Sequence, residues 1–333
     1  MERTKKENIK NTRLYLGPMS KNIVDAIIDY NTNVRNVVGI VASRRQIDYS
    51  GGYVNNWKTY SFIEYIKSKN PDIIVCRDHG GIGQGRALDN GLDSFYQDAS
   101  QNMDIIHIDP FKQFSLDESI IYTCRIINTC SYMNENCLFE VGTEQAIYPM
   151  TAAALDYFLL KIKERIPELF PKIIYTVIQS GTSLQSGTNT GEYNRTRLLM
   201  MIDICKNYGV LSKEHNGDYL QPKQIKEKFK LGLDAINIAP EIAHIETEYI
   251  LETMSESNIN KWFDLCFNNN LWAKWFPKDF DPYTDKYKVL KLCGHYVFTN
   301  PEFNDIFNLD EASNYVRQEL HKFINERILK LKD

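Results

Sequence analysis

The chain has 333 residues and a formal net charge of −4 at pH 7, with a pI near 5.9. This mild acidity argues against a protein that binds nucleic acid or an anionic membrane through its overall charge. A hydrophobic fraction of 43% and a charged fraction of 25% are ordinary for a globular protein, and no apolar run approaches the roughly 20 residues that span a bilayer. The length predicts either two domains or one large barrel.

The cysteines and the first residues of the chain bear on its compartment. The seven cysteines are an odd number without CxxC spacing, and most lie in apolar segments. This pattern predicts free buried thiols in a reducing cytoplasm, and we do not expect them to bind metal. The leader from Met1 to Glu7 is charged and no apolar core follows it, so no signal peptide is visible. We therefore expect a cytoplasmic protein that does not enter a membrane.

Short apolar runs rich in β-branched residues recur along the chain, and each ends in polar residues. Such runs are typical of buried strands, and they cover residues 13–19, 37–43, 72–79, 104–110, 137–144, 172–179, 210–215 and 234–240. Segments with apolar residues at helical spacing lie between them, over residues 21–30, 60–69, 116–134, 151–165, 192–208 and 222–231. This alternation is the pattern of βαβ units, which form parallel sheets.

Eight strands alternating with helices over about 240 residues match the count and size of a (β/α)8 TIM barrel. A doubly wound open sheet is the alternative, although such sheets usually have fewer strands. After residue 245 the strands stop and an aromatic-rich segment with helical patterns begins. We therefore expect a (β/α)8 barrel over residues 1–245 and a C-terminal helical extension packed on it over residues 246–333.

Polar residues gather where the predicted strands end. In chain order they are Asp78, His79, His107, Asp109, Glu144, Gln179, His215 and Asn237. The C-terminal ends of all strands share one face of a barrel, so these residues are expected to converge there. His107 and Asp109 are two residues apart and therefore point to the same side of their strand.

This set of side chains suits a divalent metal ion. Neutral imidazoles together with a carboxylate or amide oxygen bind zinc or a similar ion and leave one position open. Such an ion polarises a ketose carbonyl and stabilises the enediolate that forms when a neighbouring bond breaks, while a carboxylate beside the site moves the proton. The alternative is that these polar residues only satisfy the backbones of the loops.

Other residues are weaker candidates for binding substrate. Arg44, Arg45 and Arg77 sit at strand ends and could pair with a phosphate or carboxylate, although arginines at loop starts are common on surfaces. The loop from Ser180 to Gly191 is rich in Gly, Ser and Thr and precedes a helix, so its N–H groups could cradle a phosphate. It matches neither a P-loop nor a dinucleotide fingerprint. His295 could reach the barrel mouth from the extension.

Taken in order, these residues resemble those of the Z-type subunits of class II tagatose-bisphosphate aldolase. The likeness runs from the first strand into the C-terminal extension and rests on short motifs at successive strand ends. They are Gln46 ahead of Gly51-Gly52-Tyr53, Asp78-His79, Ile106-His107-Ile108-Asp109, Gly142-Thr143-Glu144, Val177-Ile178-Gln179, Glu214-His215 with Asp218-Tyr219, the segment 236–240, and the segment around His295. Each motif is short, but their common order is specific.

The resemblance implies a (β/α)8 barrel related to the zinc-dependent class II aldolases. Named members of the family act beside a catalytic partner subunit, and other relatives epimerise ketoses or ketose phosphates at C4. By this likeness His79 and His215 would hold the metal ion, with zinc expected and manganese as the alternative, and Asp78 would be the acid and base. Gln179 stands where the class II aldolases have a further histidine, so it would be a weaker ligand.

To this set we add Glu144, as a metal ligand or a catalytic carboxylate, and Asp109 as another catalytic acid. The residues expected to contact substrate are Gln46, Arg77, His107, Ser180, Gly181, Asn237 and His295. Two departures from the family pattern lie among them: Asn237 stands where the Z-type subunits have lysine, and Ser180-Gly181 replaces Pro-Gly. The resemblance therefore does not fix the substrate as tagatose bisphosphate.

The leading hypothesis is a metal-dependent enzyme that acts on a ketose or ketose phosphate, by aldol cleavage or by C4 epimerisation through an enediolate. One alternative is a non-catalytic subunit that stabilises a separate class II aldolase chain, and another is a sugar-binding module without chemistry. The expected partners are thus a sugar or sugar phosphate and either an aldolase chain or further copies of this chain. An acid and two imidazoles at the barrel mouth favour the enzyme, because a scaffold has no physical need of them.

Overall fold

Eight parallel strands form the centre of the molecule, in a computed structural model that describes residues 5–34, 38–86, 89–185 and 187–328. They close into a barrel in the order β1-β10-β9-β6-β5-β4-β3-β2. The barrel strands are β1 (Leu14–Leu16), β2 (Val38–Ser43), β3 (Val75–Gly80), β4 (Ile105–Ile108), β5 (Leu138–Val141), β6 (Ile173–Ile178), β9 (Leu211–Glu214) and β10 (Ala235–Ile238). The predicted (β/α)8 barrel is confirmed. Val37, the first residue of the second predicted strand, lies outside the described residues, as do 1–4 of the leader and 329–333 of the extension.

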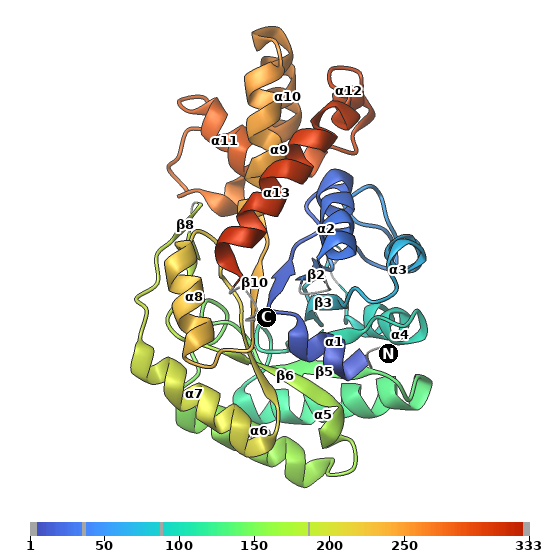
Figure 1. Cartoon of the computed structure of the whole chain (residues 1–333), viewed down its shortest axis with the longest axis vertical. Helices are drawn as coiled ribbons and strands as arrows, with labels where there is room; N and C mark the ends of the chain where they lie inside the picture. Colours follow the sequence, from blue (N-terminus) through green and yellow to red (C-terminus); the bar gives the residue numbers. More distant parts are fainter. Residues whose placement is uncertain (1–4, 35–37, 87–88, 186, 329–333) are drawn as a thin grey trace.

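Helices cover the outside of the barrel and connect its strands (Figure 1). They are α2 (Lys21–Asn33), α3 (Thr59–Lys69), α4 (Leu92–Ser100), α5 (Leu116–Met133), α6 (Ala152–Arg165), α7 (Arg195–Tyr208) and α8 (Pro222–Lys230). The sequence did not predict α4, because its buried face includes the polar residues Ser94 and Asp98, which hide the apolar periodicity. A short 3-10 turn, η1 (Phe170–Lys172), precedes β6, and a small hairpin, β7 (Leu184–Gln185) with β8 (Thr188–Asn189), lies between β6 and α7.

The inside of the barrel is filled with side chains and is not a pore. The apolar cluster there consists of Ile9, Tyr15, Val41, Ile74, Cys76, Ile105, Leu138, Tyr175 and Ala235. Ile9 comes from α1 (Lys5–Asn11), a helix within the predicted charged leader, whose buried residues include Asn8 and Ile9. This packed core leaves the C-terminal ends of the strands as the place where polar groups can gather.

The segment after β10 is helical, as predicted. It contains α9 (Pro240–Thr253), α10 (Glu256–Asn269), η2 (Ala273–Trp275), α11 (Lys286–Cys293), η3 (Gly294–Val297), α12 (Pro301–Asn304), η4 (Leu309–Ala312) and α13 (Ser313–Arg327). These elements stand beside the barrel, and α13 packs against α2 and α9 (Figure 1). Residue 245, where the sequence placed the end of the barrel domain, lies within α9, so this helix runs from the barrel into the extension.

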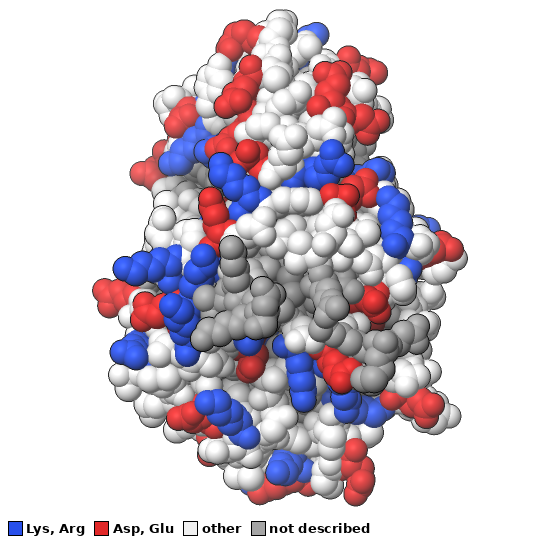
Figure 2. All heavy atoms as spheres, viewed as in Figure 1, with Lys and Arg blue, Asp and Glu red and all other residues white. Residues whose placement is uncertain are grey.

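The surface and the cysteines agree with the expectations from composition. Acidic and basic side chains are interspersed on the face seen in Figure 2. All seven cysteines are free and buried. In the part of the chain that the structure describes, no helix is long and apolar enough to cross a membrane. The cytoplasmic location remains a prediction.

Candidate metal centre

An irregularity in strand β3 brings two neighbouring side chains to the same end of the barrel. In a regular strand Asp78 and His79 would point to opposite faces. His79 instead has a left-handed backbone with φ of 44°, and the pairing of β3 with β4 shifts between Arg77 and Gly80. Gly80 allows the close approach that follows, because a Cβ there would lie 2.5 Å from the carbonyl oxygen of His107. Both Asp78 and His79 therefore reach the barrel mouth.

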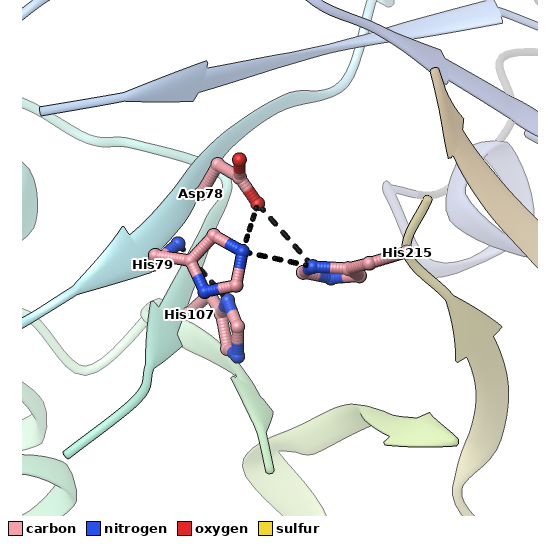
Figure 3. A group of neighbouring side chains, drawn as sticks. All are labelled: Asp78, His79, His107 and His215. Carbon is pink, nitrogen blue, oxygen red and sulfur yellow. Dashed lines mark hydrogen bonds and ion pairs between the residues drawn. The ribbon is translucent and has the colours of Figure 1, made fainter. Parts of the chain in front are cut away.

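Four side chains from three strand ends form one cluster. Asp78, His79, His107 and His215 each have one atom of a kind that can bind a metal ion, and these atoms all lie within 4.8 Å of one another (Figure 3). His79 Nε2 is 3.3 Å from His215 Nδ1. Asp78 Oδ1 is 3.7 Å from His79 Nε2 and 3.6 Å from His215 Nδ1. Asp78, His79 and His215 thus present three atoms at the corners of a nearly equilateral triangle.

This triangle has the dimensions of one face of a tetrahedral metal site. Two donors that share a tetrahedral ion at bonds of about 2.1 Å lie about 3.4 Å apart. Two imidazole nitrogens and one carboxylate oxygen are also a donor set that zinc accepts, with a fourth position left for substrate or water. The residues present therefore fit the divalent ion that the sequence predicted.

Buried carboxylates hold the far side of both imidazoles. His79 Nδ1 is 2.6 Å from Asp109 Oδ2, and His215 Nε2 is 2.7 Å from Glu140 Oε1. Thr143 Oγ1 donates to the same oxygen of Asp109 at 3.1 Å. A carboxylate behind a histidine fixes the ring orientation and keeps the opposite nitrogen available for a metal ion. Asp109 is thus placed behind His79.

His107 supports the cluster with both of its ring nitrogens engaged. Its Nδ1 accepts a hydrogen bond from the backbone N–H of His79 at 3.1 Å, and its Nε2 donates to the carbonyl of Gly142 at 3.0 Å. Burial lowers the pKa of His107 to about 4, so the ring is neutral, as this pair of contacts requires. His107 therefore holds the unusual backbone of His79 in place.

The electrostatics of the cluster favour a positive charge between these groups. Burial alone would lower the pKa of His79, but Asp78 and Asp109 outweigh it and raise the value to about 10. Burial alone would raise the pKa of Asp78, but His79, His215 and His107 lower it. A site that retains a proton so strongly also favours a bound cation in the place of that proton.

A cavity of about 340 Å³ opens beside the cluster. Five predicted site residues line it: Asp78, His79, Glu144, His215 and Asn237. Glu144 Oε2 accepts a hydrogen bond from Asn216 Nδ2 at 2.5 Å. Asn237, also in the lining, places its Nδ2 3.5 Å from Asp78 Oδ1, and its own Oδ1 is buried without a hydrogen-bond partner among the described residues.

The structure places other predicted residues away from this cavity. Arg77 is fully buried, and its guanidinium is bidentate to Asp98 at 2.7 and 2.6 Å and donates to the carbonyls of Ala42 and Ile47. Both ends of the Gln179 amide are hydrogen-bonded to neighbouring backbone. Its Oε1 accepts from the N–H of Met150, and its Nε2 donates to the carbonyls of Thr143 and Tyr148, each at 2.9 Å. These contacts anchor loops and helices around the barrel.

Gln46, Ser180, Gly181 and His295 are likewise absent from the described lining of the cavity. Gln46 Oε1 accepts from the N–H of Ser43. Ser180 Oγ donates to a buried carboxylate of β9, Glu214, and Gly181 follows with a φ of 102°.

His295 is 1% exposed and its two ring nitrogens have no hydrogen-bond partner among the described residues. It packs between the rings of Tyr53 and Tyr296.

The buried pair Glu140 and Lys213 escaped the sequence analysis. Lys213 Nζ is 2.7 Å from Glu140 Oε2 and 3.9 Å from the centre of the Tyr15 ring, inside the barrel. The sequence did contain a signal for this pair: Glu140 and Lys213 are charged residues within two predicted buried strands. Charged side chains are rarely buried unless they are paired. Through Glu140, this pair supports His215.

Comparisons with known proteins add the fold relationship. No protein-family model and no curated protein sequence matches the chain. Solved structures do match most of it, and three of them serve as examples. A protein from Sinorhizobium meliloti described as a probable tagatose 6 phosphate kinase has a TM-score of 0.74 at 13% identity, covering 95% of this chain and 94% of its own.

Two further neighbours are described as aldolases. The YdjI aldolase from Escherichia coli has a TM-score of 0.56 at 14% identity, with 92% and 96% covered. A fructose-bisphosphate aldolase from Campylobacter jejuni has a TM-score of 0.57 at 12% identity, with 97% and 91% covered. The chain shares the fold of these aldolases. The predicted resemblance to aldolases is confirmed at the level of the fold.

Proposed function

We propose that the chain is a metal-dependent enzyme that acts on a ketose or ketose phosphate, by aldol cleavage or by C4 epimerisation through an enediolate. The observation that carries the proposal is the triangle of Asp78, His79 and His215 donor atoms, with a buried carboxylate behind each imidazole. The aldolase fold of the neighbours supports the reaction class. Zinc is the expected ion and manganese the alternative.

In this proposal His79 Nε2, His215 Nδ1 and Asp78 Oδ1 would hold the metal ion. A bound divalent ion would act as a Lewis acid toward the substrate carbonyl. Glu144 lines the same cavity and is oriented by Asn216, so we assign it the movement of the proton. These roles differ from those implied by the family resemblance, which gave proton transfer to Asp78 and a ligand role to Gln179.

Two isosteric variants test this division of roles. Asp78→Asn should weaken zinc binding, while Glu144→Gln should keep the metal and lose about 10²- to 10⁴-fold in turnover. Metal content and release of aldehyde or of the C4 epimer from a panel of ketose phosphates are the measurements. If Asp78→Asn keeps the metal and loses turnover while Glu144→Gln is fully active, Asp78 is the proton carrier and our assignment is wrong.

A non-catalytic subunit of a class II aldolase is the second candidate. The observation in its favour is Gln179, because this residue directly after β6 is an amide committed to loop contacts where the aldolases would supply an imidazole. The two candidates differ in a direct assay. A subunit would show no turnover alone and would raise the activity or stability of a separate aldolase chain, whereas an enzyme turns over by itself.

A further inference from the structure

Three cationic side chains from separate parts of the chain line the cavity beside the candidate metal centre. Arg45 follows β2, Lys112 follows β4, and Lys274 belongs to η2 of the helical extension. β2 and β4 flank β3, the strand that carries Asp78 and His79, so the two barrel cations sit on either side of that strand end.

The neighbouring arginines are paired with carboxylates, whereas among the described residues these three cations are not, although Lys112 Nζ donates to Gln84 Oε1 at 2.6 Å. Arg44 is buried and forms ion pairs with Asp48 and Asp89 at 2.9 and 2.6 Å, and Arg77 is paired with Asp98. Within the described parts of the chain, no carboxylate lies within ion-pair distance of Arg45, Lys112 or Lys274. Of the three arginines that the sequence placed at strand ends, only Arg45 lines the cavity.

The three cations lie close enough to disfavour one another's charge. Loss of hydration and the charge of Arg45 lower the pKa of Lys274 to about 8; Cys293 acts in the opposite direction, and the charge of Lys112 adds a smaller lowering effect. Loss of hydration and Arg45 also lower the pKa of Lys112, against weaker effects of Asp109, Glu144 and Asp78. An anion bound among them would relieve this repulsion.

Two aromatic side chains of the helical extension contact Lys274, which lines the cavity from the side of the extension. Its ammonium lies 4.9 Å from the ring centre of Trp275 and 5.1 Å from that of Tyr296. The indole N–H of Trp275 donates to the Tyr296 hydroxyl at 3.0 Å. Tyr296 in turn packs edge-on against Tyr53, whose backbone N–H donates to the carbonyl of Arg45 at 3.1 Å. The loop that carries Arg45 and the extension that carries Lys274 are therefore joined directly.

We propose that Arg45, Lys112 and Lys274 form a subsite that binds the phosphoryl group of the substrate. The inference rests on the proposed function for the rest of the substrate, but the subsite itself needs no metal. A phosphate dianion carries the charge and the acceptor oxygens that one guanidinium and two ammonium groups can share. The proposal moves the phosphate away from the loop at Ser180 and Gly181, where the Ser180 hydroxyl is committed to Glu214 and Lys228.

Calorimetric titration of inorganic phosphate into chelator-treated protein tests the subsite. Lys274→Met and Arg45→Met should each weaken phosphate binding about 10-fold or more, since each removes a charged hydrogen-bond donor. Lys278→Met is the matched control, because Lys278 is an exposed lysine three residues after η2. Equal affinities of the wild type, Lys274→Met and Lys278→Met, or no binding to the wild type, would overturn the proposal.

A second comparison separates this inference from the proposed function. D-Fructose 6-phosphate should bind more tightly than D-fructose, and Lys274→Met should remove most of that difference. Phosphate binding in a protein that takes up no zinc would leave the subsite standing and remove the metal-dependent enzyme. Zinc binding with no preference for the phosphorylated sugar would do the reverse.

Discussion

Replacement of Glu140 with glutamine tests how the buried charges behind His215 support the candidate metal centre. One oxygen of Glu140 is 2.7 Å from His215 Nε2, and the other is 2.7 Å from Lys213 Nζ. Glu140 is 1% exposed and Lys213 is fully buried. Glutamine keeps the shape but removes the charge, so it weakens the support of His215 and leaves the Lys213 ammonium buried without a counter-ion.

Two losses of different size and kind follow from this change. Loss of the carboxylate behind a metal-binding histidine costs about 10- to 100-fold in metal affinity, or about 1.4–2.7 kcal/mol. A buried charge left without its partner costs about 3–5 kcal/mol in the free energy of unfolding. In the double variant Glu140→Gln/Lys213→Met both charges are gone, so most of the stability should return while the metal affinity stays low.

Competition with a chromophoric chelator gives the zinc affinity, and urea unfolding of the metal-free protein gives the stability. Glu164→Gln is the control, because this carboxylate is on the outside of α6 and its side chain is 50% exposed. It should leave the zinc affinity unchanged and lower the stability only slightly, because its ion pair with Lys161 is exposed. A double variant that binds zinc as tightly as the wild type would refute the role given to Glu140.

Two further predictions concern Arg77 and Lys274. Arg77→Met should lower the free energy of unfolding by about 3–5 kcal/mol, because it leaves Asp98 buried and unpaired. Urea unfolding of Arg77→Met, compared with Arg77→Met/Asp98→Leu, measures this loss. If the single variant is instead stable and binds phosphate weakly, Arg77 is a substrate residue. The affinity for phosphate should fall as the pH rises through about 8, because Lys274 loses its charge there while phosphate is already dianionic. Phosphate titrations across this pH range should show the fall in the wild type. The same fall in Lys274→Met would contradict the assignment.

The barrel could be predicted from sequence because its strands are buried on both sides. Such strands appear as continuous β-branched runs, and each of the eight runs overlaps an observed strand. The helix α4 escaped prediction because its buried face mixes polar with apolar residues. In α4 the buried Asp98 is there to pair with Arg77 from β3, and this tertiary contact has no signature in the local sequence.

The candidate site was only partly predictable. His79 and His215 could be placed together because all strand ends share one face of a barrel. Strand alternation alone, however, would have placed His79 on the same side as Arg77 and opposite to Asp78, and the left-handed backbone of His79 reverses this. Lys274 could not be assigned to the cavity, because nothing local shows how a helical extension folds back over a barrel mouth.

The metal content of the purified chain tests the central claim most directly. Elemental analysis of the wild type after incubation with zinc and removal of excess should find about one ion per chain. The His79→Ala/His215→Ala variant should contain none, while His321→Ala, which changes a histidine on α13, should match the wild type. A wild-type chain that retains no divalent ion, or a double variant that retains as much as the wild type, would contradict the metal centre described here.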